Sequence, residues 1–174
     1  MSVFLQPLQT VTVGSGGATS VSFNSIPQGY TDLKLVISIR TTFNGSNNFT
    51  YAYNFNGSSS GYSHRTLEGN GSSAVSINAS NLTYGFTGWI NDAATTSNTF
   101  TSSELYIPNY TSSNYKSQIV DTVTENNATL AYQTLHAGLW SNTAAINSIQ
   151  VSVFGQTIQQ YSTFALYGVL RQGI

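Results

Sequence analysis

Alternation of apolar and other residues, rather than helical spacing, is the feature that most constrains the fold of this chain. The clearest case lies between Asp32 and Arg40, where Leu or Ile occupies every second position from Leu33 to Ile39. This period indicates a half-buried strand. No stretch of about ten residues has the three-and-four apolar spacing of a helix. Short alternating segments separated by turn clusters predict an all-β protein, an antiparallel sandwich or barrel. A sandwich explains why several strands carry one apolar face and one face of Ser, Thr and Asn.

The turn clusters divide the chain into a series of expected strands. The first two are expected to pair with each other as a hairpin or bent edge across Gly14–Gly17. The expected strands are residues 9–13, 19–23, 32–40, 49–55, 62–67, 83–90, 103–108, 116–125, 131–140, 146–154 and 163–170, and residues 72–82 are Ser/Asn-rich with only a weak alternation at Val75 and Ile77.

The last expected strand, residues 163–170, is the most apolar run in the sequence. Phe164, Leu166 and Leu170 point one way, whereas Ala165, Tyr167 and Val169 point the other. A strand that is apolar on both faces is expected to be covered on both faces. We therefore expect it in the middle of a sheet, with a second sheet or a neighbouring subunit on its other side.

The length of the chain, 174 residues, predicts one domain spanning 1–174, with a short N-terminal arm over residues 1–8. The sequence contains no cysteine, so no disulfide contributes. The first residues lack a basic segment followed by a long apolar core, and we expect no secretory signal. No apolar run is long enough for a transmembrane helix, and we expect no membrane partner.

Charged residues are scarce. They make up only 6% of the chain, and the net charge is −1, whereas an average domain has about 25% charged residues. Without a basic patch, nucleic-acid binding is not expected. Low net charge also gives little electrostatic protection against association. Composition therefore favours contact with other copies of the chain or with a large partner over a monomer kept soluble by hydroxyl and amide groups.

Motifs for catalysis and for metal or cofactor binding are weak. Gly57-Ser58-Ser59-Ser60-Gly61 matches the nucleophile-elbow pattern but lies in a low-complexity segment with no helix expected after it. His64 and His136 are the only histidines, and neither has the local ligand spacing of a metal site. Asp121 shares its strand face with Ile119 and Val123, so we expect it to be partly buried and hydrogen bonded. We predict no catalytic residues, no metal site and no cofactor.

Several aromatic residues lie near Asn, Ser and Gly, which is the composition of a contact surface. The same rings would suit stacking on sugars, and they would equally suit a sheet core, because aromatic residues favour strands. These aromatic residues are Tyr51, Tyr53, Tyr62, Tyr84, Trp89, Tyr110, Tyr115 and Trp140.

The order of several short motifs carries a resemblance to a known class of proteins. The motifs are Ile26-Pro27-Gln28-Gly29-Tyr30-Thr31-Asp32-Leu33, Asn54-Phe55-Asn56-Gly57 with Tyr62-Ser63, Ile107-Pro108-Asn109-Tyr110, Trp140 with Ala145-Ile146-Asn147-Ser148-Ile149, and Tyr161 to Val169. In this order they resemble small virion structural proteins of tailed bacteriophages, especially those of aquatic and cyanobacterial hosts. The resemblance implies a β-sandwich, often a jelly roll, that acts by assembling and has no catalytic residues to carry over. A single domain without a fibrous stalk is more similar to a capsid decoration (cement) protein than to a tail fibre.

We therefore predict a non-enzymatic capsid decoration protein, made in the cytoplasm of the host bacterium and located on the capsid surface of the virion. Its expected partners are its own copies, with a trimer favoured, and the major capsid protein. The N-terminal arm is expected to dock on a neighbour or else to pair within its own subunit. The expected contact residues are Val3, Phe4, Leu5, Tyr51, Tyr53, Tyr62, Trp89, Tyr110 and Trp140. A tail module that recognises host surface glycans is the alternative, and an enzyme acting on polysaccharide is a third hypothesis.

Overall fold

The computed structural model describes residues 3–45, 50–125 and 131–171. Within these residues the chain forms strands and no helix, and it therefore has no helix long and apolar enough to cross a bilayer. The strands are β1 (Val3–Thr12), β2 (Ser20–Phe23), β3 (Asp32–Ile39), β4 (Thr50–Phe55), β5 (Tyr62–Gly69), β6 (Ala74–Leu82), β7 (Gly85–Trp89), β8 (Thr101–Ile107), β9 (Lys116–Glu125), β10 (Ala131–Trp140), β11 (Ile149–Ser152) and β12 (Thr163–Arg171).

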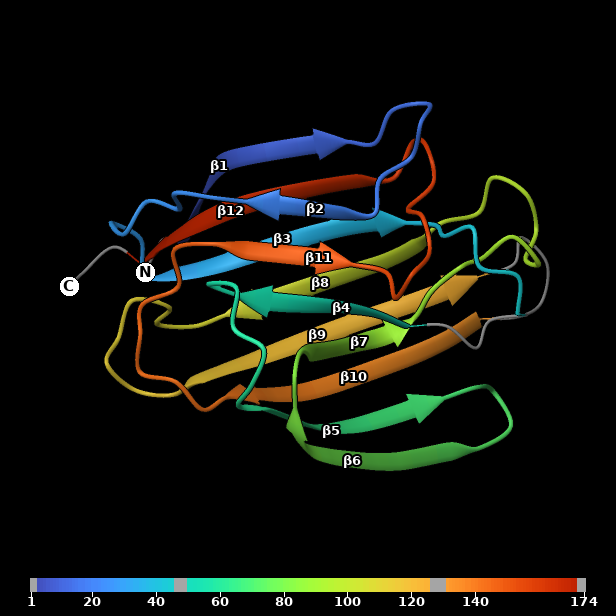
Figure 1. The fold of residues 1–174 in the computed structure, drawn as a ribbon. Coiled ribbons are helices and arrows are strands. Elements are labelled where there is room, and N and C mark those ends of the chain that lie inside the picture. The colour runs from blue at the N-terminus through green and yellow to red at the C-terminus, as the bar shows by residue number, and fades with distance from the viewer. Residues whose placement is uncertain (1–2, 46–49, 126–130, 172–174) are drawn as a thin grey trace.

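Two antiparallel sheets pack face to face (Figure 1). The larger sheet has eight strands in the order β1-β12-β3-β8-β9-β10-β5-β6, and the smaller has four in the order β2-β11-β4-β7. The predicted all-β sandwich is confirmed. In Figure 1 the smaller sheet lies in front of the larger one, and β5 and β6 extend beyond it at the lower end.

The strand order is that of a jelly roll with two inserted hairpins. Without β5, β6, β9 and β10, the sheets read β1-β12-β3-β8 and β2-β11-β4-β7, which is the arrangement of an eight-stranded jelly roll. The β5–β6 hairpin and the β9–β10 hairpin both add to the same edge of the larger sheet, beyond β8. These four inserted strands give the protein a surface that the eight-stranded core would lack.

The core explains why most of the predicted contact aromatics are not on the surface. Trp140 stacks on Tyr62 with ring centroids 6.1 Å apart and meets Phe55 edge-on at 5.5 Å. Five of the expected contact residues are at most 2% exposed, so the contact prediction is wrong for them and the core alternative holds. These five are Tyr51, Tyr53, Tyr62, Tyr110 and Trp140. Alternation along the strands cannot distinguish a buried aromatic face from an exposed one.

The N-terminal segment is a strand rather than a free arm. β1 pairs with β12 from Val3 to Thr12, with a shift in register after Pro7. The expected hairpin between residues 9–13 and 19–23 is also wrong, because β2 pairs with β11 in the smaller sheet. Phe4 and Leu5 are about half exposed on this edge strand, and the side chain of Val3 lies outside the described residues. Phe4 and Leu5 therefore remain available as contacts from this segment.

The C-terminal strand β12 lies between β1 and β3, one strand from the sheet edge. Its inward residues Phe164 and Leu166 are buried in the core. Ala165 and Tyr167, on the opposite face, are only partly covered. The expectation that both faces are covered is therefore wrong within a single chain, because the second sheet packs on one side only.

Candidate functional site

The inserted strands β9 and β10 carry apolar residues on their outer face and polar residues on their inner face. Residues of β9 alternate between buried and exposed, and the exposed set includes Ile119, Asp121 and Val123. The predicted partial burial of Asp121 is therefore wrong. Antiparallel partners share a face, and Val120 pairs with Leu105 of the core. That pairing turns Val120 inward and its apolar neighbours outward.

The direction in which the side chains of β10 point is also set by a residue that is fixed in the core. Trp140 is fixed in the core, so Thr134 and His136 point inward on the same face, and Leu135 and Ala137 point outward. Ser103 and Thr122 share a hydrogen bond of 2.7 Å in the inward polar layer. A sheet with this inverted polarity leaves apolar side chains in water.

Four apolar residues on the outer face of β5, β9 and β10 lie side by side in one continuous strip. Leu135 pairs with Leu67 of β5, and Ala137 lies between Ile119 of β9 and Arg65 of β5. Leu67, Ile119 and Leu135 are 60%, 57% and 42% exposed. We call Leu67, Ile119, Leu135 and Ala137 the outer strip. A shallow depression runs over it.

Charged groups border the outer strip on opposite sides. Arg65 lies beside Ala137 on β5, and Asp121 lies beside Leu135 on β9. Further along the same face, on β8, Glu104 makes an exposed ion pair with Lys34 at 2.8 Å. The strip is therefore an apolar surface with one cationic and one anionic border.

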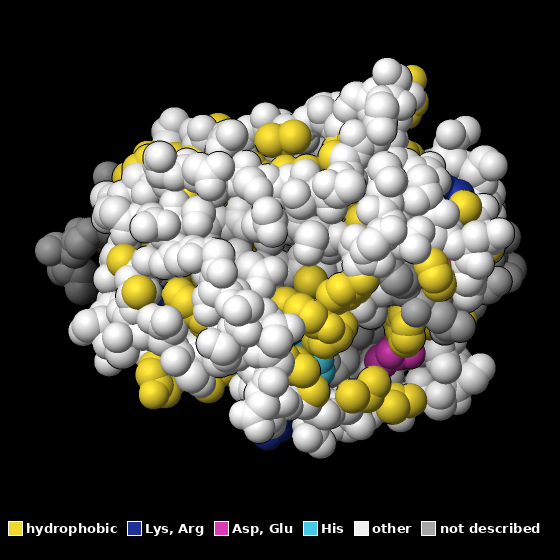
Figure 2. All heavy atoms as spheres, viewed as in Figure 1, with side chains coloured by type: hydrophobic (Ala, Val, Ile, Leu, Met, Phe, Trp, Pro, Cys, Tyr) yellow, Lys and Arg dark blue, Asp and Glu magenta, His cyan; other side chains and the backbone are white. Residues whose placement is uncertain are grey.

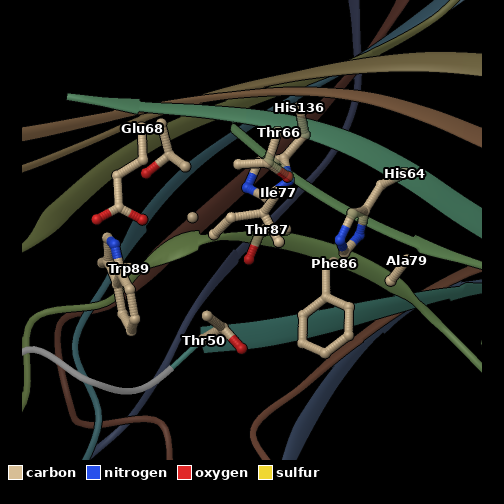
Figure 3. Close-up of a pocket in the computed structure, with 12 residues that line it drawn as sticks. Thr50, His64, Thr66, Glu68, Ile77, Ala79, Phe86, Thr87, Trp89 and His136 are labelled. Atoms are coloured by element: carbon tan, nitrogen blue, oxygen red, sulfur yellow. The ribbon is translucent and has the colours of Figure 1, made fainter. Parts of the chain in front are cut away.

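A second feature is a cleft where the inserted strands extend past the smaller sheet. It is lined by β5, β6 and β10 from the larger sheet and by β4 and β7 from the smaller one, and its volume is about 250 Å³. Figure 2 shows hydrophobic side chains gathered around a hollow that also holds a histidine and an acidic side chain. In Figure 3, Thr66 and His136 lie near the centre, Glu68 and Trp89 toward one end, and His64 and Phe86 toward the other.

The cleft contains polar atoms without hydrogen-bond partners. Thr66 Oγ1 lies 2.6 Å from His136 Nδ1, which fixes the imidazole ring. His136 Nε2, Thr134 Oγ1 and His64 Nδ1 are buried and make no hydrogen bond. His136 is 6% exposed and Thr134 is 3% exposed. A buried polar group left unpaired costs about 1–3 kcal/mol, so these atoms are the ones that a ligand would satisfy.

The histidines of the cleft are neutral near pH 7. Burial lowers the pKa of His136 to about 4, and the neighbouring His64, whose ring centroid is 5.5 Å away, adds to this effect. The backbone of Thr87 faces the ring and raises the pKa in part, although its geometry does not meet that of a hydrogen bond. Burial, together with the charge of Arg65, also lowers the pKa of His64. The centre of the cleft therefore presents uncharged rings.

The close approach of β7 to the larger sheet depends on Gly88. A Cβ atom at this position would lie 2.6 Å from Thr134 Oγ1 and 2.7 Å from Thr122 Cβ. We expect Gly88→Ala to lower the free energy of unfolding by about 1–3 kcal/mol, because the sheets would have to separate. Urea denaturation measures this change. Gly69→Ala, in β5 with no atom near its added Cβ, is the matched control and should leave stability within about 0.5 kcal/mol. Equal effects of the two substitutions would contradict the packing argument.

The structure places the other candidate residues as follows. Of the nine predicted contact residues, Trp89 lines the cleft and Phe4 and Leu5 are exposed on β1. The Gly57–Gly61 segment joins β4 to β5 without a helix after it in the described residues, unlike a nucleophile elbow. The described residues contain no group of three or more His, Asp or Glu side chains that would hold a metal ion.

Sequence reasoning missed the pairing of the two histidines. His64 and His136 are far apart in the chain and were interpreted separately, whereas β5 and β10 are neighbours in the sheet. The only signal was that each lies in an alternating segment. Phe86 and Thr134 carried no signal at all, because their role depends on the contact between the two sheets.

Comparisons of the chain with known protein families, with curated proteins and with solved structures found no match. The functional argument therefore starts from the outer strip and the cleft.

Proposed function

We propose that this protein is a non-enzymatic structural component of a tailed-bacteriophage virion, a capsid decoration protein that binds the outer head lattice and its own copies. The observation that carries the proposal is the outer strip. Three large aliphatic side chains are exposed side by side on a sheet face of a protein with 6% charged residues. Contiguous exposed apolar surface of this kind marks interaction sites.

The outer strip suits contact with another copy of the chain. Its two charged borders have opposite signs, so Arg65 of one copy can face Asp121 of another while the apolar side chains meet between them. Apolar burial supplies most of the stabilisation in such an interface, since exposed ion pairs contribute little. The resemblance described above favours a trimer seated on the major capsid protein.

The strip is tested by Leu135→Lys. Because Leu135 is exposed, the substitution should leave the fold intact. We expect self-association to weaken at least about 30-fold, equivalent to about 2 kcal/mol, because a charge would be placed in an apolar contact. Sedimentation equilibrium of the wild-type and variant proteins measures the change. A variant that associates as tightly as the wild type would exclude the strip from the interface.

Phe4→Lys is the companion variant, since it changes an exposed apolar residue on β1 rather than on the inserted strands. It tests the N-terminal segment separately from the outer strip. Deletion of residues 2–8 is a poorer test, because it would also remove the strand that pairs with β12. If Phe4→Lys loses association and Leu135→Lys does not, the interface lies on β1 rather than on the outer strip.

Salt dependence gives an independent test of an apolar interface. Screening weakens exposed ionic contacts but leaves apolar burial almost unchanged. We expect the dissociation constant of the oligomer to change less than about threefold between roughly 50 mM and 500 mM NaCl. A change of a hundredfold would indicate that charge, rather than the outer strip, holds the copies together.

The virion location is tested by finding the protein in intact particles by cryo-EM. A head protein would be present in hundreds of copies and a tail-tip protein in a handful. The proposal requires density on the capsid exterior and a mass above that of one chain for the purified protein. A monomer at high concentration that is absent from the capsid exterior would contradict the decoration function.

A tail module that binds glycans remains the second candidate. Trp89 and Glu68 lie toward the same end of the cleft (Figure 3) and favour this candidate, because aromatic rings and carboxylates bind sugars. Burial of five other predicted aromatics counts against it. Saturable binding on a glycan array that is lost in Trp89→Ala would favour this candidate over the decoration protein. The third hypothesis, a polysaccharide hydrolase, would need two carboxylates facing a cleft, whereas Glu68 is the one carboxylate among the described residues that line this cleft.

A further inference from the structure

The cleft between the inserted strands and β7 is a candidate ligand site, separate from the outer strip. Its centre holds three buried polar atoms without partners, on His64, Thr134 and His136. Two of these side chains are at least 94% buried, since Thr134 is 3% exposed and His136 is 6% exposed. Groups of this kind are rare in folded proteins unless a ligand or an ordered water satisfies them.

The arrangement of His136 shows what kind of group it can bind. Thr66 holds Nδ1 at 2.6 Å, so the ring is fixed and the remaining ring nitrogen, Nε2, is the atom left for a ligand. In either tautomer Nε2 pairs with a hydroxyl group, because a hydroxyl both donates and accepts. A carboxylate or ammonium would not match both tautomers.

The other side chains that line the cleft indicate the shape and polarity of the rest of the ligand. Phe86 and His64 meet edge-on with centroids 5.3 Å apart at one end, and Trp89 and Ile77 also line the cleft. Apolar and aromatic walls favour a flat ring. An apolar cavity of about 150 Å³ accommodates benzene, so the volume of about 250 Å³ fits one six-membered ring with small substituents. A hexose would bring more hydroxyl groups than the unpartnered atoms can satisfy.

We propose that this cleft binds an uncharged aromatic ring bearing a hydroxyl group, with the hydroxyl on His136 Nε2 and the ring against Phe86 and His64. The same chemistry has two sources, a free phenolic compound and the tyrosine side chain of a neighbouring polypeptide. Tyr115 and Tyr161 of another copy are suitable donors, since they are 58% and 68% exposed. The proposal does not depend on the virion location or on the outer strip.

The experiment titrates the full-length protein with p-cresol and, in parallel, with p-xylene, which has the same shape but no hydroxyl. We expect p-cresol to bind with a dissociation constant on the order of 0.1–1 mM and at least about five times more tightly than p-xylene. Ring ¹⁵N spectra of the wild-type protein should show a shift at His136 Nε2 and little change at Nδ1. Equal binding of the two probes, or no shift at Nε2, would overturn the proposal.

Two variants locate the binding site. His136→Phe should reduce the preference for p-cresol over p-xylene to about onefold. Ile77 is exposed on the rim of the cleft. Ile77→Trp should therefore block binding of both probes and keep His136 and the fold intact. This variant tests the site even if His136→Phe does not fold. Unchanged p-cresol binding in Ile77→Trp would place the ligand elsewhere and overturn the proposal.

Mass measurement during the titration shows whether the natural ligand is a free phenolic compound or the tyrosine side chain of a neighbouring copy. If p-cresol binds without changing the oligomeric state, the natural ligand is a free phenolic compound. If p-cresol dissociates the oligomer, and Tyr115→Phe or Tyr161→Phe has the same effect, a neighbouring copy supplies the tyrosine. Either result supports the site. Tighter binding of benzylamine than of p-cresol would show that the cleft selects a cation, which would overturn the proposal.

Discussion

Replacing Trp140 with alanine is expected to lower the free energy of unfolding by about 3–5 kcal/mol. The indole is 1% exposed, stacks on Tyr62 and meets Phe55 edge-on. Its Nε1 also donates a hydrogen bond of 3.3 Å to Ser58 Oγ. The substitution would therefore leave a large cavity between β10 and the smaller sheet and would remove the hydrogen bond to the β4–β5 loop. Urea denaturation followed by circular dichroism measures the loss.

The control for Trp140→Ala is Tyr115→Ala, which removes a ring that is 58% exposed. Its effect should stay within about 0.5 kcal/mol. The pair also separates the two interpretations of the aromatic residues that the sequence left open. If Trp140→Ala kept its stability but lost association with other copies, Trp140 would be a contact residue and the core assignment would be wrong.

Acidification from pH 6.5 to pH 4 is expected to remove about 3 kcal/mol of stability through His136. Burial lowers the pKa of this histidine from 6.5 to about 4 in the folded protein. Between these two pH values the unfolded chain binds a proton that the folded protein does not, so stability falls as the pH falls. The contribution is fully present above pH 6.5. His64, whose pKa is also lowered by burial, acts in the same direction.

The measurement is the free energy of unfolding as a function of pH for the wild type and His136→Gln. Carboxylates titrate in the lower part of the same range, so the difference between the two curves isolates the histidine. The variant should have a shallower slope between pH 6.5 and pH 4, whatever its stability at pH 7. If the free energies of unfolding of the wild type and of His136→Gln had the same dependence on pH, His136 would not be the group whose protonation lowers stability.

Individual strands of this protein are predictable, but their partners are less so. β3 was expected at residues 32–40 and lies at Asp32–Ile39, because its aliphatic residues alternate without interruption. The two N-terminal strands were expected to pair with each other and instead belong to different sheets. Turn residues mark where a strand ends, but they do not show whether the next strand pairs with it or crosses to the opposite layer.

The direction in which an alternating strand faces is equally undetermined by its own residues. In β9 the apolar residues Ile119 and Val123 face solvent, although their pattern alone would turn them inward. The pairing of Val120 with Leu105 sets the phase of β9, and Trp140 sets that of β10. A partner one residue out of register would exchange the two faces. The outer strip, and with it the candidate interface, therefore emerges only from the pairing of the strands.

The amino-acid sequence by itself determined the β class, the sandwich and the scarcity of charge, because these follow from period and composition, which are local properties. Only the tertiary structure decided which aromatics are buried, where Asp121 faces, and that His64 and His136 meet in one cleft. Those features depend on contacts between strands far apart in the chain. The physical reason is that a strand hydrogen bonds to its neighbours rather than to itself, so its surroundings are set by residues that its own segment does not contain.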